Sequence, residues 1–236
     1  MITKIIYPIG RKMVNCPHQC KDVINNPRKG IVPRGIILEA IDDYGNPTVG
    51  TSTSISNAAL GVIVVGLNPG ESGTKERYHY RHYFKHHGRN YQSVTNWHKK
   101  SINTYKYHSR LRKLIQQLNR TNILWTEIAK CENRNKKNNP CVETLHFCSG
   151  IYLKNEIDGL LSLSNHNNKW LILGIGRDAW KALAFLYPRE AVIGIPHPTG
   201  SWGYYSKLFS HNGQLLRKHF NSITAAITTK HAIWLE

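Results

Sequence analysis

The chain has 236 residues, 40% of them hydrophobic, with 32 Lys and Arg against 14 Asp and Glu and a formal net charge of +18. This length and apolar content suffice for one substantial core, and the absence of a long apolar run argues against a membrane protein. So positive a field attracts polyanions, which makes DNA the expected partner, with a secreted cationic protein or a ribosome-associated one as alternatives.

The first residues, Met-Ile-Thr-Lys-Ile-Ile, lack the long apolar stretch of a signal peptide. We therefore expect a cytoplasmic, DNA-associated monomer. Residues 1–60 do not fit the pattern of the rest and are predicted to be an N-terminal elaboration that carries the pair Cys16 and Cys20. Residues 61–236 are predicted to form the main domain of one compact unit.

Short continuous apolar runs indicate strands that are covered on both faces. They lie at residues 61–66, 123–129, 170–173 and 191–195. Helical periodicity or helix signals separate them at 107–118, 143–161, 176–187 and 216–227. This alternation predicts an α/β fold, a three-layer α/β/α sandwich around a mainly parallel sheet. The basic, Asn-rich segment 132–140 is predicted to be a solvated loop.

Two loops that follow predicted strands carry polar side chains at the edge where parallel sheets bind ligands. The first reads Gly-Leu-Asn-Pro-Gly-Glu-Ser over 66–72, and its Asn68 presents a side-chain amide on a turn stiffened by Pro69. The second reads Pro-His-Pro-Thr-Gly-Ser-Trp over 196–202, and two prolines fix His197 as a donor aimed at a developing anion. Taken alone, the first pattern is more typical of an ordinary turn, and the second of an ordinary histidine at the surface or in the core.

In this order, the two loops resemble the paired motifs of the uracil-DNA glycosylase superfamily. The first loop is similar to the water-positioning motif of the mismatch-specific and single-strand-selective branches. The second is similar to the His-Pro-Ser motif, with Thr199 in place of Ser. A third similarity, to the iron–sulfur branches, covers Trp-Thr-Glu-Ile-Ala-Lys-Cys at 125–131 and continues through Cys148. The resemblance spans about residues 61 to 220 and depends on the order of the motifs.

The resemblance implies a monofunctional DNA glycosylase that flips out a pyrimidine and hydrolyses its N-glycosidic bond. Asn68 and His197 would be catalytic, the first positioning the water and the second donating to O2 of the leaving base, and both would face one cavity. Residues expected at the base are Gly66, Leu67, Pro69, Tyr83, Phe84 and Glu127, with Tyr83 or Phe84 stacking on it. Tyr78 and Tyr80 are expected to pack in the core instead. Residues expected at the DNA are Thr199, Gly200, Ser201, Trp202, Lys99, Lys100 and Lys207, with Trp202 either as a wedge or as an ordinary buried tryptophan.

Glu127 stands where the iron–sulfur branches have an Asn that reads uracil. An ionised carboxylate only accepts hydrogen bonds, so it favours the N4 amino group of cytosine over the O4 of uracil. We therefore expect a modified cytosine as substrate, in DNA repair or in defence against modified viral DNA. If the alignment with the iron–sulfur branches is shifted by one residue, Thr126 takes the position that reads the base instead of Glu127. The alternatives are a uracil or mismatch glycosylase of base excision repair, and a non-catalytic, metal-containing nucleic-acid-binding protein.

By resemblance, Cys16, Cys20, Cys131 and Cys148 match the ligands of a 4Fe-4S cluster. The first pair is spaced Cys-x3-Cys instead of Cys-x2-Cys, and zinc, which accepts either spacing, is the alternative. Cys148 also falls on an apolar helix face, so it can be a buried structural thiol. Gly174 and Gly176 mimic a dinucleotide fingerprint, but no acidic residue follows at the required distance, which favours tight strand-to-helix packing.

Overall fold

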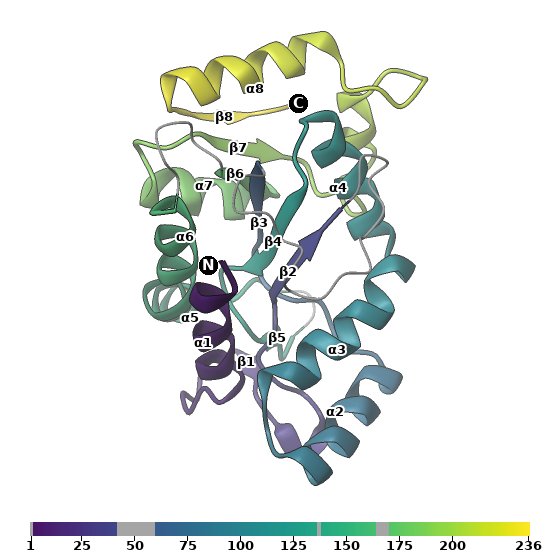
Figure 1. Ribbon diagram of the computed structural model, residues 1–236, viewed down its shortest axis with the longest axis vertical. Helices are drawn as coiled ribbons and strands as arrows, with labels where there is room; N and C mark the ends of the chain where they lie inside the picture. Colours follow the sequence, from purple (N-terminus) through teal and green to yellow (C-terminus); the bar gives the residue numbers. More distant parts are fainter. Residues whose placement is uncertain (1, 42–59, 136–137, 164–169) are drawn as a thin grey trace. The chain divides into compact units, whose positions relative to one another are not determined.

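The computed structural model describes residues 2–41, 60–135, 138–163 and 170–236 (Figure 1). These residues form two compact units whose segments alternate along the chain. Unit 1 comprises Met1–Ile37, Leu67–Asn103 and Thr126–Leu163, and unit 2 comprises Leu38–Gly66, Thr104–Trp125 and Ser164–Glu236. Within the described ranges, every helix is too short or too polar to span a bilayer.

A six-stranded sheet has the order β2-β4-β3-β6-β7-β8 (Figure 1). The β3–β6, β6–β7 and β7–β8 pairs are parallel. Every residue of β3 and β6 is buried, as expected of strands covered on both faces. The predicted α/β fold with a mainly parallel sheet is therefore confirmed. The strands are β2 (Ile36–Ala40), β3 (Gly61–Gly66), β4 (Asn122–Glu127), β6 (Trp170–Ile175), β7 (Val192–Ile195) and β8 (Ala232–Trp234).

Three helices of unit 2 lie where the sequence predicts them, namely α4 (Lys106–Gln117), α7 (Arg177–Leu186) and α8 (Arg217–Thr229). The short 3-10 helix η4 (Tyr204–Leu208) was not predicted. Helix α8 buries His219, Ile223 and Ala226, whereas Phe220 is 44% exposed. Helix α7 packs on β6 and β7, and α8 on β7 and β8. A Cβ atom at Gly174 would lie 2.8 Å from the Cα atom of Trp180, so tight strand-to-helix packing is confirmed at this glycine. Gly176 has a φ of +83° and serves the turn itself.

Unit 1 is built mainly from helices that the apolar pattern did not predict. They are α1 (Ile2–Val14), α2 (Thr74–His87) and α3 (Tyr91–Ser101), with 3-10 turns at Pro27–Lys29 and Ile102–Thr104, the latter ending at the first residue of a unit 2 segment. The predicted helix at 143–161 is found as α5 (Val142–Cys148), a π-helical turn (Ser149–Leu153) and α6 (Lys154–Leu161). Helix α1 contacts α3 and α6.

Two expectations about irregular segments are corrected. Part of the predicted elaboration at 1–60 belongs to the central sheet, because β2 is its edge strand beside β4. The predicted solvated loop at 132–140 begins with β5 (Glu132–Asn133), which pairs antiparallel with β1 (Val23–Ile24). Glu132 is 2% exposed. Glu132 is buried because it pairs with Arg34 and accepts a hydrogen bond from the Ser72 amide, in the loop that carries Asn68.

Candidate functional site

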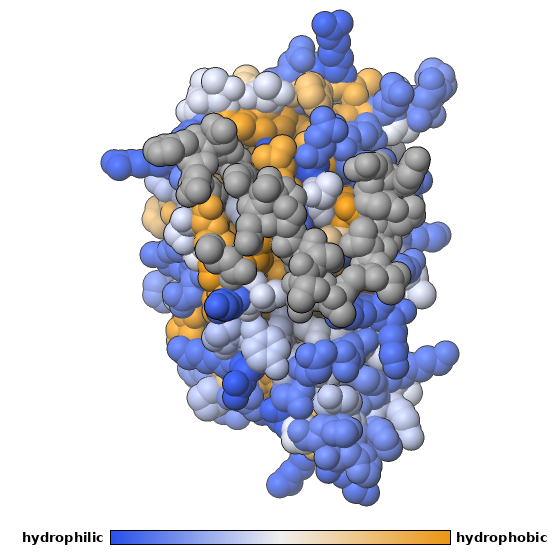
Figure 2. All heavy atoms as spheres, in the orientation of Figure 1, coloured by the Kyte–Doolittle hydropathy of each residue, from blue (hydrophilic) through white to orange (hydrophobic). Residues whose placement is uncertain are grey.

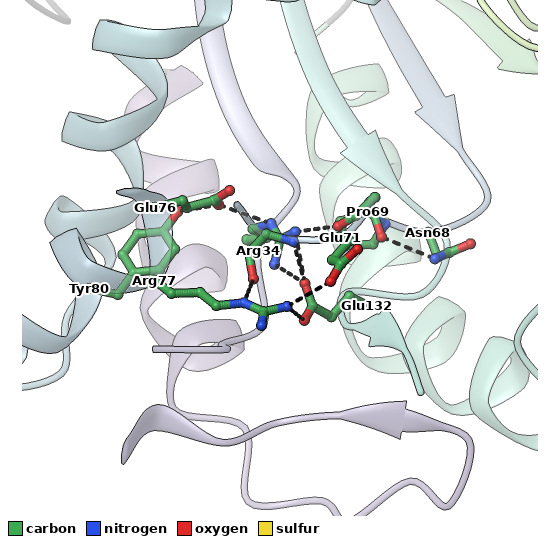
Figure 3. Close-up of polar contacts among 10 residues, drawn as sticks. Arg34, Asn68, Pro69, Glu71, Glu76, Arg77, Tyr80 and Glu132 are labelled. Atoms are coloured by element: carbon green, nitrogen blue, oxygen red, sulfur yellow. Dashed lines mark hydrogen bonds and ion pairs between the residues drawn. The ribbon is translucent and has the colours of Figure 1, made fainter. Parts of the chain in front are cut away.

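The loop after β3 presents Asn68 with a fixed amide orientation. The Asn68 Nδ2 group donates to the carbonyl of Pro69 at 3.1 Å, so the amide oxygen is turned the other way. Figure 3 shows this oxygen pointing away from the neighbouring polar cluster. The backbone of the same loop is held because the amide of Ala129 donates to the carbonyl of Leu67 at 2.9 Å. Asn68 therefore offers an acceptor at the carboxyl end of β3.

A buried ion pair between Arg34 and Glu132 holds the backbone of this loop in place (Figure 3). Two nitrogens of Arg34 each donate to Glu132 Oε2 at 3.2 Å. Arg34 also donates to the carbonyl of Gly70, and the amide of Ser72 donates to Glu132 Oε2 at 2.6 Å. The two charges are thus satisfied partly by the backbone of the Asn68 loop, so the loop and the ion pair require each other.

Further charged groups extend this cluster. Arg77 donates to Glu132 Oε1 at 3.1 Å and to the Ser72 hydroxyl at 2.9 Å. Glu76 pairs with Arg34 Nε at 3.2 Å and accepts from the Tyr80 hydroxyl at 3.0 Å. Burial alone would lower the pKa of Arg34, but Glu76 and its other acidic neighbours raise that pKa above its usual value. The guanidinium is therefore held charged inside unit 1.

Sequence reasoning missed Arg34 and Glu132. Neither residue lies in a recognisable motif, and they are separated by 98 positions. The sequence does hold one signal for Glu132, which is that acidic residues are few. In a chain with only 14 of them, a glutamate shortly after a predicted strand is a candidate for a specific ion pair.

Glu127, the expected base reader, is the last residue of β4 and lies against Gly35, where a Cβ atom would come within 2.8 Å of the Glu127 Cγ atom. Burial raises its pKa to about 8, although the cations Lys130 and Arg34 partly oppose the shift. The carboxyl is therefore largely protonated at neutral pH, which differs from the ionised group that the sequence suggested. A protonated carboxyl both donates and accepts.

Thr126, the other candidate reader, is committed to a buried cluster. It is 3% exposed, donates to Glu156 and accepts from the Lys130 ammonium at 2.6 Å. Lys130 also pairs with Glu156 at 2.8 Å and donates to the carbonyl of Glu127 at 2.6 Å. These bonds use the Thr126 hydroxyl and hold the end of β4, which favours Glu127 as the side chain available to a ligand.

In unit 2, the loop after β7 fixes the tautomer of His197. The backbone amide of Thr199 donates to His197 Nδ1 at 3.3 Å, so Nδ1 is the acceptor and Nε2 carries the proton. The Tyr107 ring lies 5.2 Å from the His197 ring. Partial burial lowers the pKa of His197 below its usual value. The imidazole is therefore a neutral donor through Nε2 in an exposed loop.

The same loop presents an aromatic and a basic group to solvent. Trp202 is 98% exposed and has a φ of +50°, a left-handed backbone conformation that non-glycine residues rarely adopt. Lys207 lies 4.4 Å from the centroid of the half-exposed Tyr204 ring. Arg110 of α4 donates to the carbonyl of Pro198, which ties the loop down. An ordinary buried tryptophan is thus excluded at 202.

The stacking candidates Tyr83 and Phe84 are half-buried on α2. Phe84 packs against the buried Tyr80 ring at 6.0 Å, and Tyr83 lies 4.5 Å from the His87 ring. Tyr78, expected in the core, is 62% exposed, so that expectation is wrong. Lys99 and Lys100 are exposed in the last turn of α3.

The four cysteines of the expected metal site all lie in unit 1 and are electrostatically coupled. Burial and then neighbouring thiols raise the pKa of Cys131, and burial raises that of Cys148 to about 11. The backbone amide of Lys130 donates to the Cys148 sulfur. Within the described ranges, however, no three His, Cys, Asp or Glu side chains stand at ligand geometry. The donor chemistry fits a thiolate-bound metal, and binding would require the thiols to deprotonate and close in.

A depression of about 370 Å³ on α1 involves none of the expected site residues and is lined by Tyr7, Pro8, Arg11, Lys12 and Asn15.

No family model, curated protein or solved structure matches this chain.

The Arg34–Glu132 pair yields a stability prediction. Glu132→Gln removes the charge that Arg34, Arg77 and the Ser72 amide share, so the free energy of unfolding should fall by about 3 kcal/mol. Denaturant titration measures it. Glu236→Gln is the matched control, because the Arg177–Glu236 pair is 60% and 67% exposed, and it should change stability by less than about 0.5 kcal/mol. A Glu132→Gln protein as stable as this control would contradict the assigned role.

Proposed function

We propose that this protein is a DNA glycosylase that excises a flipped pyrimidine and leaves an abasic site. The observation that carries the proposal is the neutral His197, whose Nδ1 accepts from the Thr199 amide and whose Nε2–H is a fixed donor. Glycosylase chemistry needs such a donor, because the base leaves with negative charge on O2. Asn68 supports it from the loop after β3, since its amide oxygen is oriented as an acceptor for water.

In the proposed reaction, the bond between C1′ and the base nitrogen breaks and its electron pair goes to the base. Nε2–H of His197 hydrogen-bonds to the base O2 as charge develops there. The water held by Asn68 adds to C1′ and gives its proton to solvent. The products are a free base and an abasic sugar in an intact strand. No strong base is needed, because the sugar becomes cation-like before the water adds.

Extrusion of the nucleotide precedes this step, since the bond is inaccessible in a stacked duplex. The fully exposed Trp202 suits a wedge that fills the vacated space. Tyr83 or Phe84 would stack on the flipped base, and the 3-10 segment that contains Lys207 would contact phosphates. We also propose the family's three-layer sandwich and a monomer that acts on intracellular DNA.

Glu127 bears on which pyrimidine is taken. A protonated carboxyl can donate to N3 of cytosine and accept from its N4 amino group, but it can equally donate to O4 of uracil and accept from N3–H. A modified cytosine, in repair or in defence against modified viral DNA, and uracil are therefore both candidate substrates. Uracil is kept as a candidate substrate because the raised pKa of Glu127 leaves the carboxyl a proton to donate to O4.

We further propose that Cys16, Cys20, Cys131 and Cys148 hold a 4Fe-4S cluster, with zinc as the alternative. The support is the all-thiol donor set and the raised pKa values of Cys131 and Cys148, to which burial contributes most and neighbouring thiols add. Such a cluster would join the segment after α1 to the end of α5 and stabilise unit 1.

The catalytic roles predict two separate losses. On duplexes with uracil, a thymine mismatch or a 5-substituted cytosine, in EDTA, the wild-type protein should produce alkali-labile sites with at least one base. Asn68→Ala and His197→Ala should each slow single-turnover excision by about 100-fold or more, with DNA affinity little changed. His211→Ala, a change at an exposed histidine elsewhere in unit 2, should have no effect. DNA binding without excision of any base would leave only the non-catalytic alternative.

The protonated Glu127 predicts a pH dependence. Excision should fall as pH rises through about 8, because the carboxyl then loses its donor. Glu127→Gln should stay active through this range, since an amide keeps one donor and one acceptor. The unfolded chain releases this proton near 4.5 while the folded protein keeps it up to about 8. The wild-type free energy of unfolding should therefore fall with rising pH in that window, and less so in the variant. Superimposable profiles for the two proteins would refute the assignment.

The metal proposal predicts a brown protein after anaerobic purification, with absorption near about 400 nm and about four irons per chain. Cys148→Ala should lose the colour and iron, whereas Cys141→Ala should keep both, because Cys141 is an exposed residue before α5 and is not among the four expected ligands. Colourless protein with stoichiometric zinc would exclude the cluster in favour of zinc.

A further inference from the structure

The outer face of α2 carries three rings in a row, Tyr78, His82 and His86, which we name the α2 ladder. The residues are four positions apart, so they lie above one another on a helix. Tyr78 and His82 have ring centroids 6.1 Å apart and planes within 12° of each other. His82 and His86 have ring centroids 4.7 Å apart, and their planes are tilted by 54°. All three residues are exposed, with Tyr78 at 62%.

Cations flank the ladder. Lys75, Arg81 and Lys85 are exposed on the same face, and at 100° per residue these six side chains fall within an arc of about 140°. The one acidic residue of α2, Glu76, is buried on the opposite side and paired with Arg34. Figure 2 shows the surface at the lower right, where Figure 1 places α2, as mainly hydrophilic. The face therefore offers flat rings in a positive field without a competing carboxylate.

This combination fits one class of partner better than others. An apolar protein surface would strip water from three cations without returning a counter-charge. A nucleic-acid strand supplies phosphates for the cations and base faces for the rings. Base faces are accessible only where a strand is unstacked, so the partner is single-stranded.

We propose that the α2 ladder is a docking surface for single-stranded DNA, with bases stacked on its rings and phosphates on Lys75, Arg81 and Lys85. The site does not depend on the proposed excision chemistry, because it uses none of the residues assigned to it. In a glycosylase, it would hold the strand that opens beside an extruded nucleotide.

The test separates stacking from charge. Fluorescence anisotropy measures binding of a thymidine oligomer and of an equally long oligomer of abasic nucleotides, which carries the same charge without bases, in EDTA and an Asn68→Ala background. Tyr78→Ala should weaken binding of the thymidine oligomer about fivefold or more and leave the abasic oligomer unchanged. Tyr78→Phe should bind like the parent. Phe185→Ala, which removes an 84% exposed ring from α7, should change neither.

Lys85→Gln reports on the phosphate contacts. It should weaken both oligomers alike and reduce the slope of log affinity against log salt by about 0.7. The proposal is overturned if Tyr78→Ala binds the thymidine oligomer as the parent does, if it weakens both oligomers equally, or if a matched RNA binds more tightly through Tyr78 than DNA. Because the background is inactive, failure to find any excised base leaves this result readable on its own.

Discussion

Two buried charges, on Arg34 and Glu132, hold the loop that carries Asn68. Taking such a pair out of water costs several kcal/mol per ion, and the attraction between the charges offsets this only when the remaining hydrogen bonds are made. Here those bonds come from the carbonyl of Gly70 and the amide of Ser72. A displaced loop would leave a buried carboxylate and a buried guanidinium incompletely paired. The ion pair therefore acts less as a source of stability than as a constraint that permits one loop conformation.

The two loops are fixed by different means. In unit 1, side-chain charges hold the Asn68 loop, while the Asn68 amide is oriented by its own neighbour Pro69. In unit 2, the backbone amide of Thr199 sets the tautomer of His197, and Arg110 holds the carbonyl of Pro198. Both arrangements leave one hydrogen-bonding atom, the Asn68 oxygen or the His197 Nε2–H, oriented before a ligand arrives. Such preorganisation is what electrostatic catalysis requires.

The strands β3, β4, β6 and β7 and the helices α4, α7 and α8 were predictable from sequence because their apolar runs and helix signals are strong, as in β3 and β6, where every residue is buried. The edge strands β2 and β8 were not predicted. Helix α2 was not predictable, because its many Tyr, His, Lys and Arg residues give no clear helical spacing of apolar positions. Its buried positions include Glu76, which is buried only because Arg34 and Tyr80 pair with it. Glu132 was misjudged for the same reason.

The candidate site shows the same limit. The motif residues Asn68 and His197 were identified from their loops, but the protonation of Glu127 was not, because it depends on burial and on the distant Arg34 as well as on Lys130. Local sequence carries turn chemistry and apolar period. It does not carry the pairing of charges that are far apart in the chain, and in this protein those pairings decide which polar side chains are free to act.

The most direct measurement is the structure of the Asn68→Ala variant bound to a duplex that contains the pyrimidine proposed as substrate. One nucleotide should be rotated out of the stack, with the base O2 within hydrogen-bonding distance of His197 Nε2 and the Glu127 carboxyl at the opposite edge. A duplex bound with every base stacked, or an extruded base whose O2 is turned away from His197, would contradict the proposed mechanism.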